Sequence, residues 1–148
     1  MRDWQFECVI PGAPIGKGRP RATKMGNHVR LYTPKRTADW ERSSALIMKN
    51  AWQSAPLDGV CRVDVVAVFP RPKRLMRKKD PQQRVWHSSK PDIDNVCKSA
   101  LDSMVMAGII RDDTQVVLLS AQSVYAAKDE GPCVEVRLSS IDGVGPLE

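Results

Sequence analysis

The sequence predicts a single α/β (α+β) domain in which a mixed sheet packs against two main helices. Three observations predict this fold class. The 148 residues match the usual size of one domain. Hydrophobic residues make up 42% and charged residues 27% of the chain, as in typical globular proteins. Segments with the hydrophobic period of a strand and segments with that of a helix follow one another along the chain. We find no repeat and no internal boundary, so residues 1–148 are treated as one domain.

The first part of the chain is expected to contain a strand, a loop and a helix. Apolar and polar residues alternate over residues 4–10, which predicts a half-buried strand. Glycines and prolines interrupt residues 11–21, PGAPIGKGRPR, and predict a loop. A short strand is expected at residues 29–33. Residues 34–53 begin with a proline and then repeat apolar and small side chains at helical spacing from Trp40, which predicts a helix.

The second part begins with a strand at residues 61–69, which is apolar on both faces and therefore expected at the centre of the sheet. Residues 71–90 hold eight basic residues and one acidic residue, too polar for a core and too long for an ordinary connection. This basic loop contains few apolar anchors, so we expect it to be mobile until it binds DNA.

The last part is expected to hold a second helix and two more strands. From Pro91, apolar residues follow the i, i+3, i+4 rule through three turns until Gly108, which predicts a helix. Strands are expected at residues 116–124 and 132–138, and a frayed tail at residues 142–148.

The distribution of charge suggests a polyanionic partner. Residues 1–87 contain 18 Lys/Arg and 7 Asp/Glu, whereas residues 88–148 contain 5 and 10. Nucleic acid is the first candidate for the basic part. Five of the acids fall between Asp92 and Asp113, where they would weaken phosphate binding unless a divalent cation neutralised them. On charge alone, two solvated faces remain an equal alternative.

Several classes of protein are not expected. No apolar run approaches the ~18–20 residues of a membrane span, and residues 1–10 do not resemble a signal peptide. The four cysteines, at positions 8, 61, 97 and 133, are far apart and lie within apolar patterns. We expect them to be buried, reduced thiols of a cytosolic protein, with neither disulfides nor a zinc site.

The acidic residues suggest a metal site. Asp92 and Asp94 flank the first turn of the second helix, and Asp112 and Asp113 are expected to open the next strand. If the start of the helix and the start of the strand lie side by side, three carboxylates come within a few ångströms of one another. Such an oxygen-only set suits Mg²⁺ or Mn²⁺. Coincidental helix capping is the alternative.

Lys98 lies one helical turn after Asp94. It is either the partner in a surface ion pair or an ammonium group that stabilises charge on a phosphoryl group held by the metal. Trp86 is a candidate for stacking on an opened base, with a core or dimer-interface position as the alternative. Ten basic residues are expected to grip DNA phosphates without reading sequence, although each one is equally well a solvated surface charge. They are Lys17, Arg19, Arg21, Lys24, Arg71, Lys73, Arg74, Arg77, Lys78 and Lys79.

Two motifs resemble those of a known family. Residues 90–116, KPDIDNVCKSALDSMVMAGIIRDDTQV, resemble the signature of the RusA family of Holliday-junction resolvases. Residues 14–21, PIGKGRPR, are similar to that family's P-x-x-K-x-R-P-R segment. The resemblance covers roughly residues 6–138 and implies a RusA-like fold. It also implies a homodimeric, Mg²⁺-dependent endonuclease that nicks four-way DNA junctions symmetrically, in DNA recombination and repair.

The resemblance also implies roles for particular residues. It places the metal-binding aspartates at Asp92, Asp94 and Asp113, with Asp112 in a supporting position, and the essential lysine at Lys98. Many members of the family are encoded by phages or prophages, so the cytoplasm of a bacterial or phage-infected cell is the expected location.

The chemistry of the residues agrees with hydrolysis assisted by a metal. The sequence offers no Ser–His–Asp or Cys–His arrangement for covalent catalysis, whereas a bound cation lowers the pKa of water and so supplies a nucleophile. One acidic cluster per chain and two cuts per junction require a two-fold dimer. Two other functions stay open: a branched-DNA-binding module that does not cut, and a metal-dependent phosphohydrolase of small nucleotides.

Overall fold

The computed structural model describes residues 4–145, which form a mixed sheet with two helices, as the sequence predicts. The five-stranded sheet has the order β1-β7-β4-β6-β5, with β4 and β6 parallel and the other neighbours antiparallel. The strand predicted to be central, β4, is the middle one. The strands are β1 (Phe6–Pro11), β4 (Cys61–Phe69), β5 (Val85–Trp86), β6 (Val116–Tyr125) and β7 (Cys133–Ser140).

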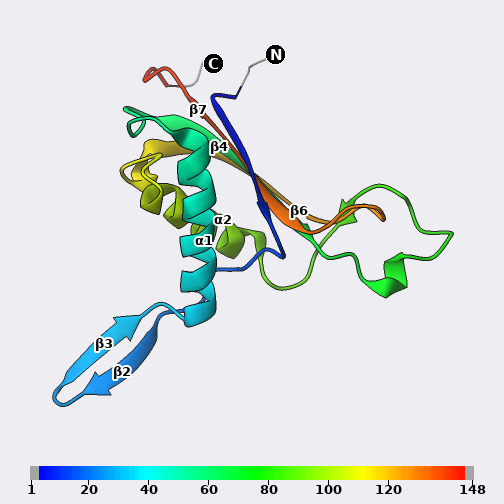
Figure 1. The fold of residues 1–148 in the computed structure, drawn as a ribbon, viewed down its shortest axis with the longest axis horizontal. Helices are drawn as coiled ribbons and strands as arrows, with labels where there is room; N and C mark the ends of the chain where they lie inside the picture. Colours follow the sequence, from blue (N-terminus) through cyan, green and yellow to red (C-terminus); the bar gives the residue numbers. More distant parts are fainter. Residues whose placement is uncertain (1–3, 146–148) are drawn as a thin grey trace.

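Both main helices, α1 (Lys35–Trp52) and α2 (Ile93–Met106), contribute to one core on one face of the sheet (Figure 1). The odd-numbered residues of β4, from Cys61 to Ala67, point into this core because alternate side chains of a strand share a face. Met48 of α1 and Met104 of α2 are fully buried there. The core therefore fixes how the two helices lie relative to each other and to the strands.

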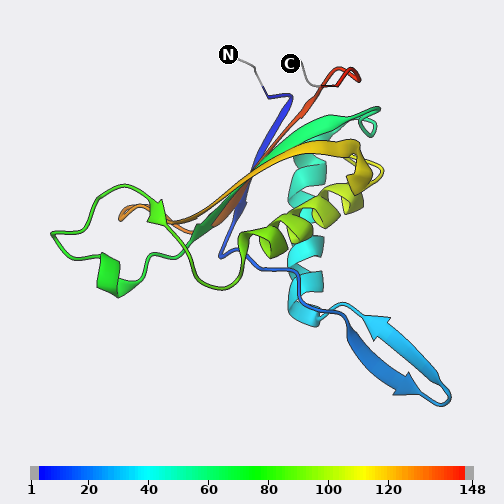
Figure 2. The same ribbon diagram turned by 180° about the vertical axis from the view of Figure 1, so that it is seen from behind.

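Two extensions project from opposite ends of the molecule (Figure 2). One is a hairpin of β2 (Arg21–Met25) and β3 (His28–Tyr32), in which every residue is exposed. The other is the basic loop, residues 71–90. The sequence predicted only one strand in place of the hairpin, because β2 has no apolar alternation, and it missed the two-residue strand β5.

The basic loop has few apolar anchors, as the sequence predicts, but hydrogen bonds and ion pairs hold it. The guanidinium of Arg71 donates to the carbonyl oxygens of Leu75, Pro81, Gln83 and Ala126 at 2.6–3.3 Å. Arg84 pairs with Glu130 and Glu135, at 2.6 and 3.0 Å. The sequence argument counted only apolar anchors, whereas these anchors are polar.

The four cysteines are buried and free, as predicted. Within residues 4–145, no helix is long and apolar enough to cross a membrane.

Candidate functional site

The two acids at the start of α2 are not occupied in capping the helix. Asp92 occupies the N-cap position, yet its side chain makes no capping hydrogen bond. Its carboxylate instead pairs with the ammonium of Lys90 at 2.9 Å. Asp94 lies in the first turn, is exposed, and forms no ion pair with any residue that the structure describes. The capping alternative therefore accounts for neither carboxylate.

Lys98 and Asp94 line the same groove. The groove lies between α2 and β6, has a volume of about 340 Å³, and also contacts Cys97, Leu101 and Leu119. No ion pair joins Lys98 to Asp94 within the described part of the chain, so the surface-pair alternative is not supported. Burial and the nearby charge of Asp94 raise the pKa of Cys97 to about 11, and its thiol therefore stays protonated.

Asp112 and Asp113 lie beyond the other end of α2, in a short 3₁₀ turn (Asp113–Gln115), and not at the start of a strand. The Asp112 carboxylate accepts a hydrogen bond from the backbone N–H of Thr114 at 2.9 Å, which lowers its pKa. Its hydrogen bond with Asp113 raises the pKa of Asp113, and repulsion by Asp102 adds to this. Asp112 thus shapes the turn, and the carboxylates of both Asp112 and Asp113 are exposed.

The predicted gathering of three carboxylates does not occur within one chain. In residues 4–145, no three His, Cys, Asp or Glu side chains are placed to hold a metal ion. Asp113 lies near Asp102, which is more than two helical turns after Asp94. The sequence argument failed because α2 separates the two pairs of acids, and its 14 residues span about 20 Å.

Lys17 is bound by acids and is not free for phosphate. Its ammonium bonds to Glu41 at 3.1 Å and to Asp102 at 2.9 Å. Burial lowers the pKa of Lys17, but the bonds to Asp102 and Glu41 outweigh it and raise the pKa above its usual value. The backbone N–H of Lys17 also donates to the carbonyl of Asn95 at 2.9 Å. Lys17 therefore ties the early loop to both helices.

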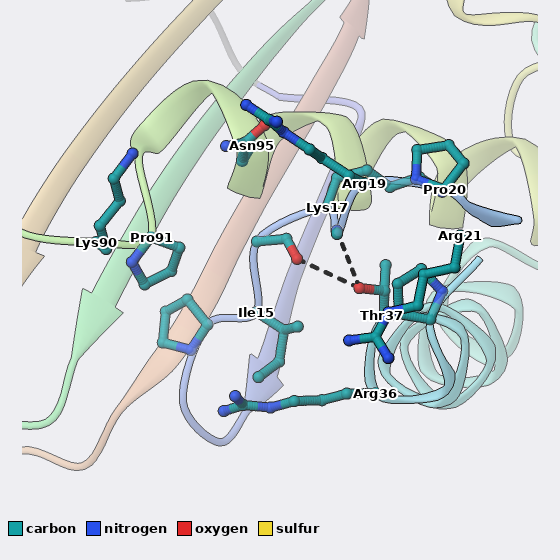
Figure 3. Close-up of a pocket in the computed structure, with 14 residues that line it drawn as sticks. Ile15, Lys17, Arg19, Pro20, Arg21, Arg36, Thr37, Lys90, Pro91 and Asn95 are labelled. Carbon is teal, nitrogen blue, oxygen red and sulfur yellow. Dashed lines mark hydrogen bonds between the residues drawn. The ribbon is translucent and has the colours of Figure 1, made fainter.

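A cavity of about 640 Å³ opens where the early loop meets the starts of the two helices (Figure 3). Arg19 and Arg21, two of the residues predicted to bind DNA, line it. Arg36 and Lys90 line it as well, and the sequence analysis did not single them out. For Arg36 a signal was available, since no Asp or Glu occurs between Glu7 and Asp39.

The family model for endodeoxyribonuclease RusA matches residues 11–139. The chain belongs to the RusA family. The resemblance seen in the two motifs is therefore confirmed, and with it the class of enzyme, a nuclease of the Holliday-junction resolvase family.

Curated relatives match 90–93% of the chain. Uncharacterized protein YqaN of Bacillus subtilis (strain 168) is 27% identical over 144 residues, 92% of this chain and 99% of that protein. Crossover junction endodeoxyribonuclease RusA of Aquifex aeolicus (strain VF5) is 22% identical over 133 residues, 90% of this chain and 91% of that protein. The crossover junction endodeoxyribonuclease of Lactococcus phage r1t is 22% identical over 138 residues, 93% and 98% of the two chains.

In this RusA-family chain, the remaining basic residues expected to bind DNA lie on the two extensions. Lys24 is exposed on β2 of the hairpin. Arg71 faces inward to its carbonyl partners. Trp86 is 74% exposed on β5, so the core alternative is wrong for it. Five exposed cations of the basic loop are called here the five loop cations: Lys73, Arg74, Arg77, Lys78 and Lys79.

Proposed function

We propose that this RusA-family chain is a Mg²⁺-dependent endonuclease that resolves four-way DNA junctions by paired symmetric nicks, as a homodimer. The observation that carries the proposal is the start of α2, where Asp92 and Asp94 present carboxylates that no helix cap uses. Basic extensions project at both ends of the molecule. Two relatives are named crossover junction endodeoxyribonucleases. Such an enzyme acts on recombining DNA, in the cytoplasm of a bacterial or phage-infected cell.

The residues at the start of α2 suit Mg²⁺ or Mn²⁺. Both cations prefer oxygen ligands and keep several waters, and Asp92 and Asp94 offer exposed carboxylate oxygens. A bound cation would supply a polarised water for in-line attack on the phosphodiester. Asp113 is the third proposed ligand. Because α2 holds it away from Asp94 within one chain, we propose that it completes the site across the dimer, with Asp112 shaping its turn.

Lys98 would act on the reacting phosphate. Its exposed ammonium lines the groove beside Asp94 and has no competing carboxylate among the described residues. From there it stabilises negative charge on the phosphoryl group, or donates a proton to the leaving oxygen. Placed beforehand in the groove, it needs little reorganisation during the reaction.

Strand β6 supports the dimer. One edge of β6 pairs with β4 along the strand, but on the other edge only Val124 and Tyr125 pair with β5. The open part carries Val117, Leu118 and Leu119, which are 47–56% exposed. Open apolar edges promote association. A two-fold axis at this edge would cover it with the same surface of a second copy, and it would bring together the grooves that contain Asp94 and Lys98.

Cleavage of a labelled synthetic four-way junction tests the proposal. With Mg²⁺, we expect two nicks at symmetry-related positions, and none in EDTA. A protein that shifts the junction equally with and without Mg²⁺ but never cuts it would be a branched-DNA-binding module. Turnover of free nucleotides in preference to DNA would indicate a nucleotide phosphohydrolase. A linear duplex of the same sequence serves as the control substrate.

A further inference from the structure

We propose that the cavity of about 640 Å³ beside the start of α2 binds one nucleotide of a DNA strand, with Arg19, Arg21 and Arg36 as the phosphate-binding groups around it. This inference rests on the proposed function and gives it a substrate-positioning site. It assigns a role to Arg36, which no motif singles out.

The size and walls of the cavity suit a nucleotide. Its volume lies within the ~300–1,000 Å³ usual for small-ligand sites. The side chains of Pro14, Ile15, Pro20, Pro34 and Pro91 line it with carbon atoms. The pyrrolidine rings and the alkyl chain offer apolar surface for a base or a sugar, while the arginines provide the polar part of the site.

The cavity is built by close contacts and not by a loose loop. A Cβ atom on Gly16 would lie 2.7 Å from the Cβ of Pro91, and one on Gly18 would lie 2.9 Å from the Cγ of Pro34. The hydroxyl of Thr37 accepts from the N–H of Gly18 at 3.1 Å and donates to the carbonyl of Gly16 at 3.4 Å. The early loop therefore fits tightly against both helix starts.

Unpaired positive charge defines the kind of ligand. No acidic residue lines the cavity. Lys17 is neutralised by Glu41 and Asp102, and Lys90 by Asp92. Arg19, Arg21 and Arg36 form no ion pair with any residue in the described range 4–145. Guanidinium groups bind phosphate through two parallel hydrogen bonds, so three of them around one cavity favour a phosphate ester.

The cavity adjoins the proposed reaction centre. Pro91 and Asn95 form part of its wall, and Asp92 and Asp94 lie between them in the sequence. Arg19, Arg36 and Lys90 line the cavity from three segments: the early loop, α1 and the chain before α2. Figure 3 shows Arg19 beside Asn95 and Arg36 on the opposite side of the cavity. A nucleotide bound in the cavity would therefore lie close in the DNA strand to the phosphate that Asp92 and Asp94 face. The site thus positions the DNA strand for the cut.

Titration with thymidine 3′,5′-bisphosphate in EDTA tests the inference directly. The probe carries a base and two phosphates, and its binding can be followed by calorimetry without any cleavage. We expect the wild-type protein to bind it more tightly than thymidine or inorganic phosphate. Arg36→Gln should bind about tenfold more weakly, the loss typical of one charged hydrogen-bonding contact. Arg42→Gln is the matched control, because Arg42 is an exposed arginine of the same helix that lies outside the cavity.

Equal affinities in Arg36→Gln and Arg42→Gln would overturn the inference, as would a wild-type protein that does not bind the bisphosphate. Arg19→Gln changes a second arginine of the cavity, on the early loop, and should also weaken binding of the bisphosphate. The test is separate from the test of the proposed function: bisphosphate binding through Arg36 in a protein that never cuts a junction would refute the resolvase but not the cavity. A protein that cuts junctions but does not bind the bisphosphate would refute the nucleotide-binding cavity but not the resolvase.

Discussion

Replacing Lys17 by methionine should destabilise the fold, although Lys17 was expected from the sequence to bind DNA. Met keeps the aliphatic length of the side chain and removes its charge. Glu41, whose side chain is 5% exposed, would then lie buried with Asp102 as its nearest charged neighbour. The change therefore leaves two acids together without their shared cation.

The size of the effect follows from burial. Removing one partner of a buried ion pair costs about 3–5 kcal/mol. Water screens part of this network, because the side chains of Lys17 and Asp102 are 25% and 41% exposed. We therefore expect the free energy of unfolding at pH 7 to fall by about 1–3 kcal/mol, less than the loss for a fully buried pair.

The loss should depend on pH. Burial already raises the pKa of Glu41, and without Lys17 that pKa rises further. A carboxyl group with a higher pKa in the folded state than in the unfolded state is destabilising above the folded pKa and harmless below the unfolded one. The difference between Lys17→Met and wild type should thus shrink as the pH falls from 7 toward 4, and Glu41→Gln should relieve it at pH 7.

Urea unfolding followed by circular dichroism measures these effects. Lys24→Met is the control, because Lys24 is an exposed lysine on the hairpin and makes no ion pair in residues 4–145. If Lys17→Met is as stable as Lys24→Met at pH 7, Lys17 is a solvated cation and the reasoning is wrong.

Three further changes test other parts of the molecule. Lys98→Ala should slow single-turnover cleavage by about 10²–10³, as for other preorganised donors, and a rate within a few-fold of wild type would make Lys98 an ordinary surface cation. Replacing the five loop cations by alanine should make junction affinity less dependent on salt. The slope of log affinity against log salt concentration should fall in magnitude by about 0.9 for each phosphate that the loop no longer neutralises. Equal slopes for wild type and variant would mean that the loop does not bind DNA. Leu118→Lys should convert the proposed dimer into a monomer in sedimentation experiments, and Val9→Lys, on the exposed face of β1, should not. An unchanged mass for Leu118→Lys would place the dimer interface elsewhere.

The elements that sequence predicts correctly are those whose signal is local. Hydrophobic period predicts α1, α2 and the central strand β4, because each packs against the core through a regular set of side chains. The hairpin strand β2 carries no such signal, since all its residues face solvent. Its existence depends on pairing with β3, which hydrophobic period does not encode.

In the candidate site, too, sequence predicts what depends on local signals and misses what depends on the fold. The motif identifies Asp92 and Asp94, but the position of Asp113 depends on the length of α2 and on the turn after it. The partners of Lys17 are distant in sequence, so its charge alone suggested phosphate. Arg36 lies in the first turn of a helix, and only the fold brings it beside the early loop.

Cleavage of the labelled junction by aspartate variants tests the central proposal most directly. Asp92→Asn, Asp94→Asn and Asp113→Asn each remove ligand charge with little change in volume, while Asp129→Asn changes an exposed acid that lies in neither carboxylate pair. With Mg²⁺, wild type and Asp129→Asn should make paired nicks, and the three variants should bind the junction without cutting it. Full nicking by Asp92→Asn and Asp94→Asn would contradict a metal site at the start of α2.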